Sequence, residues 1–162
     1  MAATDALLDE TLAAWRANER INSMLIKKMG TKGLLATLST RGGRTVGRQF
    51  AHLHNVRIYQ LSKRAKPVSA GLHVFPSKVE PAKKELLAAL AESSKRVEEW
   101  FTRAHAGEPK FRLMKPGLVT TAAYLIAHES HHRGNMLLTL KQSGIKLGIA
   151  VTYGIWGEWG KK

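Results

Sequence analysis

Five of the seven histidines fall on two short segments, and their spacing is suited to binding a metal ion. His52 and His54 lie on the first segment, and His128, His131 and His132 on the second. In a helix, residues four apart lie about 40° apart around the axis and one turn apart along it, so two imidazoles can point at one ion. Because the chain has no cysteine, a metal would have to be bound through nitrogen and oxygen atoms.

The second segment lies in a predicted amphipathic helix over residues 118–142. Its apolar stripe is formed by Leu118, Leu125, Met136 and Leu140. A helical wheel places His132 about 40°, His128 about 80° and His131 about 140° from the centre of this stripe. The first two therefore face or border the core, where metal binding would replace the polar partner that an imidazole loses on leaving water. A hydrogen-bonded core histidine is the alternative, and both interpretations stay open at this point.

A third ligand would come from a predicted helix over residues 46–63. The apolar face of this helix is formed by Val46, Phe50 and Leu53. His52 and His54 each lie about 100° from the centre of that face, on opposite edges, so periodicity does not choose between them. His52 shares its edge with Val56 and Tyr59, one and two turns further on, which predicts that His52 is the more enclosed of the two.

Two further helices are predicted, and the four together indicate an all-α protein. One spans residues 5–29, and the other follows a capping box at Ser77–Glu80 and spans residues 78–105. No alternating strand pattern is present, so the expected fold is a four-helix bundle in a single domain, residues 1–162. The glycine-rich tail that starts at Gly148 is expected to be a short irregular segment packed on the bundle.

The composition is strongly basic, with 26 Lys and Arg residues against 12 Asp and Glu residues and a net charge of +14. Such a charge attracts anions of many kinds, including nucleic acid, phosphorylated metabolites, acidic thiols and carboxylates. The N-terminal residues lack a signal-peptide pattern, and no apolar run approaches the ~20 residues that a membrane helix needs. We therefore expect a cytoplasmic protein with no membrane partner.

Residues 128–132, HESHH, also fit the H-E-x-x-H motif of zinc proteases, in which the glutamate is the general base. Only Glu158 follows as a further carboxylate ligand, and no predicted strand could pair with a peptide substrate. The protease interpretation is therefore disfavoured. Glu129 and Tyr59 adjoin histidines, but helix packing or solvation explains both more simply, so no catalytic residue is assigned.

Two segments resemble the DinB/YfiT-like family, whose name refers to DNA-damage-inducible proteins. The segment AHESHHRGNMLLTLKQSG (127–144) is similar to the family signature H-x-x-H-H-R-G-Q and the leucine-rich turn after it. The segment RQFAHLHNVRIYQL (48–61) is similar to the helix that carries the family's first metal ligand. Asn135 stands where the family usually has glutamine, which is a conservative difference near the site.

The resemblance implies an antiparallel four-helix bundle with a long crossover connection, a divalent metal site of three histidines and commonly a homodimer. Matched residue by residue, the A-H-L of the first segment implies His52 as a ligand. The H-x-x-x-H of the second implies His128 and His132. His54 and His131 are the alternatives at these positions.

Three neutral histidines leave positions on the ion open for water or substrate, as in catalytic rather than structural sites. Zinc and nickel are the metals expected for such a donor set. The resemblance implies a metal-dependent enzyme, of thiol-dependent transferase, isomerase or hydrolase type, that acts on a small anionic or thiol substrate.

Two other functions compete with the metalloenzyme. The basic segments RGGRTVGR (41–48) and KRAK (63–66) bracket the helix of His52 and would suit a nucleic-acid-binding stress-response module without catalysis. However, no helix-turn-helix spacing or array of stacking aromatics is present, and charges at helix ends are usually solvated. A metal-free structural bundle would keep the same fold without the ion.

Overall fold

The computed structural model describes residues 3–161, and the regular elements in this range are all helical. The four long helices are α1 (Ala3–Lys28), α3 (Val46–Arg64), α5 (Lys83–His105) and α6 (Leu118–Gln142). The shorter elements are α2 (Thr31–Leu34), α4 (Lys66–Ser69), α7 (Ile149–Gly157) and the 3-10 turn η1 (Glu158–Gly160). The expected all-α class is confirmed. Within the described range, no helix has the length and apolar character that crossing a membrane requires.

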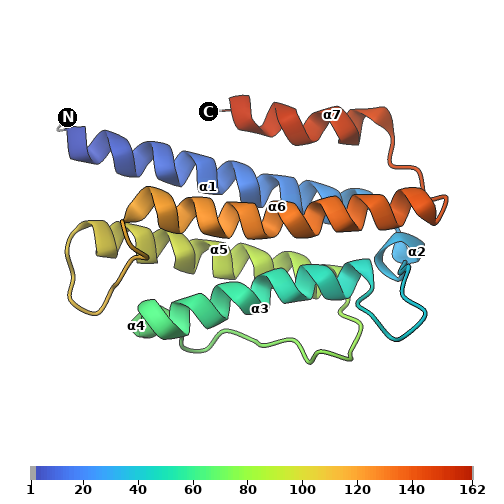
Figure 1. The fold of residues 1–162 in the computed structure, drawn as a ribbon, viewed down its shortest axis with the longest axis horizontal. Coiled ribbons are helices and arrows are strands. Elements are labelled where there is room, and N and C mark those ends of the chain that lie inside the picture. Colours follow the sequence, from blue (N-terminus) through green and yellow to red (C-terminus); the bar gives the residue numbers. More distant parts are fainter. Residues whose placement is uncertain (1–2, 162) are drawn as a thin grey trace.

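The four long helices lie side by side around a shared interior (Figure 1). Helices α1 and α6 run in one direction, α3 and α5 run in the other, and both α1 and α3 pack on α5 and on α6. Aromatic side chains are fully buried at both ends of this interior, with Phe50 in one apolar cluster and Trp15 and Trp100 in the other. Burying a side chain of this size contributes roughly 1.5–3 kcal/mol, so the core can fold without any ion.

The predicted apolar stripes face this interior. Leu118, Leu125, Met136 and Leu140 on α6 are buried, as are Val46, Phe50 and Leu53 on α3. Because each stripe must turn inward, the rotation of α3 and α6 about their axes is fixed. The rotation in turn determines which histidines can meet between the two helices.

Helix α5 begins at Lys83, five residues later than predicted, so the capping box assigned to Ser77–Glu80 is wrong. Pro81 disfavours the helical conformation at Glu80 and delays the helix start. Glu85 caps the observed start, since its carboxylate accepts a hydrogen bond from the Ala82 backbone N–H at 3.0 Å.

The C-terminal tail is helical, and the expected irregular segment is wrong. Helix α7 packs on α1, and Arg20 of α1 donates hydrogen bonds to the carboxylate and backbone oxygens of Glu158, at 3.0 and 2.8 Å. A Cβ at Gly154 would lie only 3.0 Å from Met24 Sδ. The glycine that lowers the helix propensity of the tail therefore also lets α7 approach α1 closely.

Candidate metal centre

The imidazoles of His52, His128 and His132 lie together between α3 and α6. One candidate ligand atom from each residue lies within 4.8 Å of the other two. The ring centroids are 5.5 Å apart for His52 and His128, 4.8 Å for His52 and His132, and 4.7 Å for His128 and His132. The structure thus brings together the three residues that the family resemblance implied, and their binding of a metal stays a prediction.

The three imidazoles are neutral at pH 7. Burial lowers the pKa of His52 to about 4, helped by the nearby charge of Arg44 and by His128. Burial also lowers the pKa of His132 to about 4, with further contributions from the neighbouring histidines and Arg44. The pKa of His128 is lowered as well, because burial outweighs the opposing charge of Glu129. Neutral rings keep a nitrogen lone pair available, which metal ligation requires.

One nitrogen of the cluster lacks a partner within the protein. His132 Nδ1 is buried and makes no hydrogen bond. Buried polar atoms are nearly always partnered, because an unpaired one loses its hydration without compensation. An unpaired nitrogen inside a group of neutral imidazoles fits a divalent ion that accepts nitrogen ligands, such as zinc or nickel.

His54 lies outside the cluster. Its Nδ1 is 3.0 Å from Ser93 Oγ and its Nε2 is 2.6 Å from the backbone oxygen of His73, so both ring nitrogens are occupied. The prediction that His52 is the more enclosed histidine is wrong, since His54 is only 1% exposed whereas His52 is half-buried. The cause is the segment after α4, which covers His54 and packs the Phe75 ring against it, 5.5 Å between centroids.

Two further residues considered from the sequence also lie outside the cluster. His131 is exposed, as the helical wheel predicted, and its Nε2 is 3.3 Å from Nδ2 of Asn135, which is also exposed. Tyr59 is 57% exposed, and the Lys63 ammonium lies 5.7 Å from its ring centroid. Neither residue is in position to complete the three-histidine group.

Glu129, the glutamate of the H-E-x-x-H string, is buried and fully engaged. Its carboxylate accepts two hydrogen bonds from Arg57, at 2.7 and 2.9 Å, one from Asn18 at 2.6 Å and one from Asn22 at 2.7 Å. Burial alone would raise the pKa of Glu129, but Arg57 and the two amides outweigh it and lower the pKa. A carboxylate that is held ionised by Arg57 and accepts four hydrogen bonds in the core is a poor general base for a substrate at the histidines.

Arg57 and Glu129 belong to a buried polar network that the sequence reasoning missed. Arg57 also donates to Glu19 at 2.7 Å, and Arg133 donates to the side-chain oxygens of Asn18 and Asn22, at 2.7 and 2.9 Å. The charges of two arginines and two glutamates thus balance one another in the interior between the helices. The available signal was the pair of asparagines one turn apart on a largely apolar face of α1, since buried amides need partners.

Positive charge borders the candidate centre. Arg44 is exposed and close enough to contribute to the lowered pKa values of His52 and His132. A small recess of about 40 Å³ beside His52 is lined by Arg44 and Arg48, among others. The approach to the three histidines is therefore suited to a small anion.

The sequence matches the model of the DinB family over residues 2–159. The chain belongs to the DinB family. The resemblance drawn from two segments is thereby confirmed, and the match extends beyond them to α1, α5 and α7. No curated protein and no solved structure matches the chain. What this DinB protein does must therefore be argued from its own residues.

Proposed function

We propose that this DinB-family chain binds one divalent metal ion through His52, His128 and His132 and acts as a metal-dependent enzyme. The observation that carries the proposal is the convergence of three imidazoles from two facing helices, with ligand atoms within 4.8 Å of one another. The lowered pKa values of the rings and the unpartnered His132 Nδ1 support it. The proposed frame is the antiparallel four-helix bundle of DinB/YfiT type, assembled as a homodimer.

The donor set favours zinc or nickel. All three ligands are neutral nitrogens, which suit late transition metals better than magnesium or calcium. A bound ion would activate a water or a thiol in the positions that the histidines leave open. The proposed reaction type is transferase or hydrolase chemistry on a small anionic or thiol substrate, and the exposed Arg44 would attract the negative charge of that substrate.

Metal titration of the untagged, chelator-treated protein tests the proposal. We expect one equivalent of Zn²⁺ or Ni²⁺ per chain by elemental analysis. We also expect the absorption of four- or five-coordinate Co²⁺ when cobalt is used as the spectroscopic probe. A protein that retains no metal after gel filtration, with any of the three ions, would refute the metal site. A screen of thiol-transfer and hydrolysis reactions on the loaded protein would then address the reaction.

The lowered pKa values predict unusual acid tolerance of metal binding. Protons compete with the metal only when the pH approaches the pKa of a ligand in the metal-free protein, which is about 4 for His52 and His132. The apparent affinity for Zn²⁺ should therefore fall at a lower pH than it would for imidazoles with the ordinary pKa of about 6.5, because the pKa values of all three ligands are lowered. Competition titrations with a chromophoric chelator would measure it. A loss centred near pH 6.5 would show that the rings are solvated like those of free histidine.

Nucleic acid ranks below metal chemistry as a partner. The segment RGGRTVGR contains Arg48, but this side chain donates to the Ser77 backbone oxygen at 2.8 Å and lies 3.9 Å from the Glu80 carboxylate. Arg44 of the same segment borders the histidines. These contacts engage Arg48 and Arg44 within the protein itself. The charge of +14 remains a general attraction for anions rather than a sign of specific readout.

A further inference from the structure

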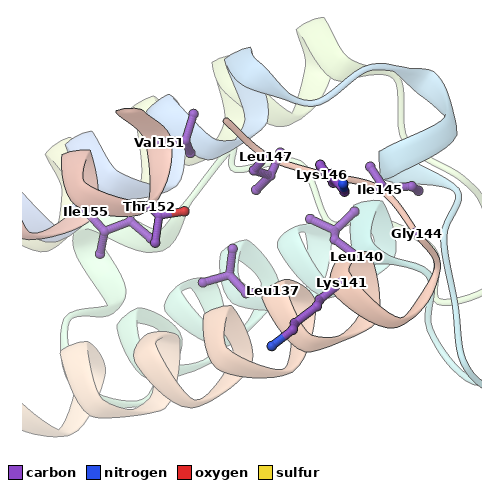
Figure 2. Close-up of a pocket in the computed structure, with 10 residues that line it drawn as sticks. All are labelled: Leu137, Leu140, Lys141, Gly144, Ile145, Lys146, Leu147, Val151, Thr152 and Ile155. Carbon is purple, nitrogen blue, oxygen red and sulfur yellow. The ribbon is translucent and has the colours of Figure 1, made fainter. Parts of the chain in front are cut away.

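A cavity of about 480 Å³ lies between the C-terminal end of α6 and α7 (Figure 2). Its walls are mainly apolar and include Leu137, Leu140, Ile145, Leu147, Val151 and Ile155. Figure 2 shows Leu137 and Leu140 rising from α6 towards the linker and α7. Pockets of this size and lining are typical of sites for small apolar or amphipathic ligands.

The cavity exists because α7 is attached to α1 rather than to α6. Its C-terminal end is fixed by the hydrogen bonds of Arg20 to Glu158, and Gly154 brings it close to Met24. The linker after Gln142 leads away from the end of α6 before α7 begins (Figure 1). The apolar sides of α6 and α7 therefore face each other across a space that neither fills.

The polar groups of the cavity wall are nearly all cationic. Lys141 and Lys146 line it and are exposed, and Thr152 contributes a hydroxyl. Between Ser130 and Gly157 the sequence contains no aspartate or glutamate. An anionic head group at the edge of the cavity would thus lie near two exposed lysines, whose flexible side chains can turn towards it, and no carboxylate from this segment, whereas a cationic head group would be repelled.

We propose that this cavity binds an amphipathic anion with a single apolar chain, a long-chain carboxylate. The chain lies between α6 and α7, and the carboxylate lies near Lys141 and Lys146. A second copy of the protein is a poorer occupant of this cavity, because a contact between two identical faces would bring the exposed Lys141 and Lys146 of both copies together. The site is independent of the proposed metal function, since no lining residue is a histidine and the clustered histidines of α6 face α3.

Three probes with the same chain and different heads test the charge argument: dodecanoate, dodecanol and dodecyltrimethylammonium, each below its micelle concentration. Calorimetry on the full chain should show one dodecanoate per chain, bound at least about fivefold more tightly than the alcohol and more tightly still than the cation. No binding of dodecanoate, or equal binding of all three probes, would overturn the proposal.

Variants locate the site. Thr152→Trp places a large side chain in the cavity from an exposed helix position and should weaken dodecanoate and dodecanol alike, at least tenfold, with helix content unchanged. The double variant K141Q/K146Q should weaken the binding of dodecanoate about fivefold and leave the binding of dodecanol unchanged. The control K84Q/K95Q makes the same change in net charge on exposed positions of α5 and should have no effect.

Three outcomes contradict the proposal. An equal loss of dodecanoate affinity in K141Q/K146Q and in K84Q/K95Q would mean that the binding responds only to overall charge. Binding to phosphatidylglycerol vesicles without binding of monomeric dodecanoate would assign the face to a lipid surface. A dimer by sedimentation that Thr152→Trp dissociates would assign it to a second copy of the chain.

Discussion

Replacing His132 with alanine is expected to lower the affinity for Zn²⁺ or Ni²⁺ by at least about a hundredfold, because loss of outer hydrogen bonds alone costs about 10–100-fold at metal sites. His132 contributes one of three candidate ligands and contains the unpartnered buried Nδ1. The fold should persist, since the buried leucines and aromatics do not depend on the ion. Metal content and circular dichroism measured on the same sample give both answers.

The matched control is His131→Ala, one position away and exposed. The His131 ring packs edge-on against that of His132, with 5.4 Å between centroids, but it is not one of the three clustered ligands, so metal affinity should stay within about twofold of the parent protein. Equal losses in the two variants would refute the assignment of ligands. Loss of helical signal together with metal in His132→Ala would make the ion a structural one.

Replacing Glu129 with leucine is expected to destabilise the protein by about 3–5 kcal/mol, because it leaves buried charge uncompensated. Arg57 and Arg133 are 1% and 5% exposed, and among the described residues Glu19 alone would remain to balance them. The two asparagine amides would also lose their acceptor. Urea unfolding followed by circular dichroism at pH 7 measures the change.

Two comparisons separate this effect from ordinary loss of a surface charge. Glu98→Leu breaks the pair with Arg16, which is 54% exposed, and should cost no more than about 1 kcal/mol. The double variant Arg57→Met with Glu129→Leu should be less destabilised than the sum of the single variants, because the second change removes a charge that the first left unpaired. Additive losses, or a Glu129 variant as stable as the Glu98 variant, would contradict a buried network.

The same carboxylate has a defined pH signature. The pKa of Glu129 is lower in the folded protein than its ordinary value, so the unfolded chain takes up the proton first as the solution becomes acidic. The stabilisation is complete above the ordinary carboxylate pKa and is lost as the pH falls through the folded value. The difference in stability between the parent protein and Glu129→Leu should therefore shrink in acid.

The sequence was sufficient for the long helices and for their inward faces, because those follow from local periodicity. It was insufficient wherever a distant segment decided the outcome. Periodicity left His52 and His54 equivalent, and the expectation that His52 is the more enclosed was wrong, so the family resemblance alone is left as the ground for choosing His52. The segment after α4 settles the role of His54 by covering it. Likewise, the hydrogen bond from Asn18 to Glu129 joins residues 111 positions apart.

The two helix boundaries that differ from the prediction have local causes in the sequence. Pro81 directly follows Glu80 and excludes it from a helix, which the capping-box pattern did not take into account. The glycines of the tail lower its helix propensity, but Gly154 allows close packing on Met24. Propensity gave the wrong answer there because a tertiary contact compensates for it.

The order of charges along α6 also helps to fix the register of this helix relative to α3. Glu129 and Arg133 are one turn apart, and Glu129 faces Arg57 in the native arrangement. If α6 slipped along its axis by about one turn, roughly 5.4 Å, its apolar stripe would still face inward, but Arg133 would take the place of Glu129 and oppose Arg57. Two guanidiniums would then meet in the core. A slip of one turn in this direction is thus disfavoured by like-charge repulsion, whereas the native register pairs Glu129 with Arg57 and brings the imidazoles of α3 and α6 together.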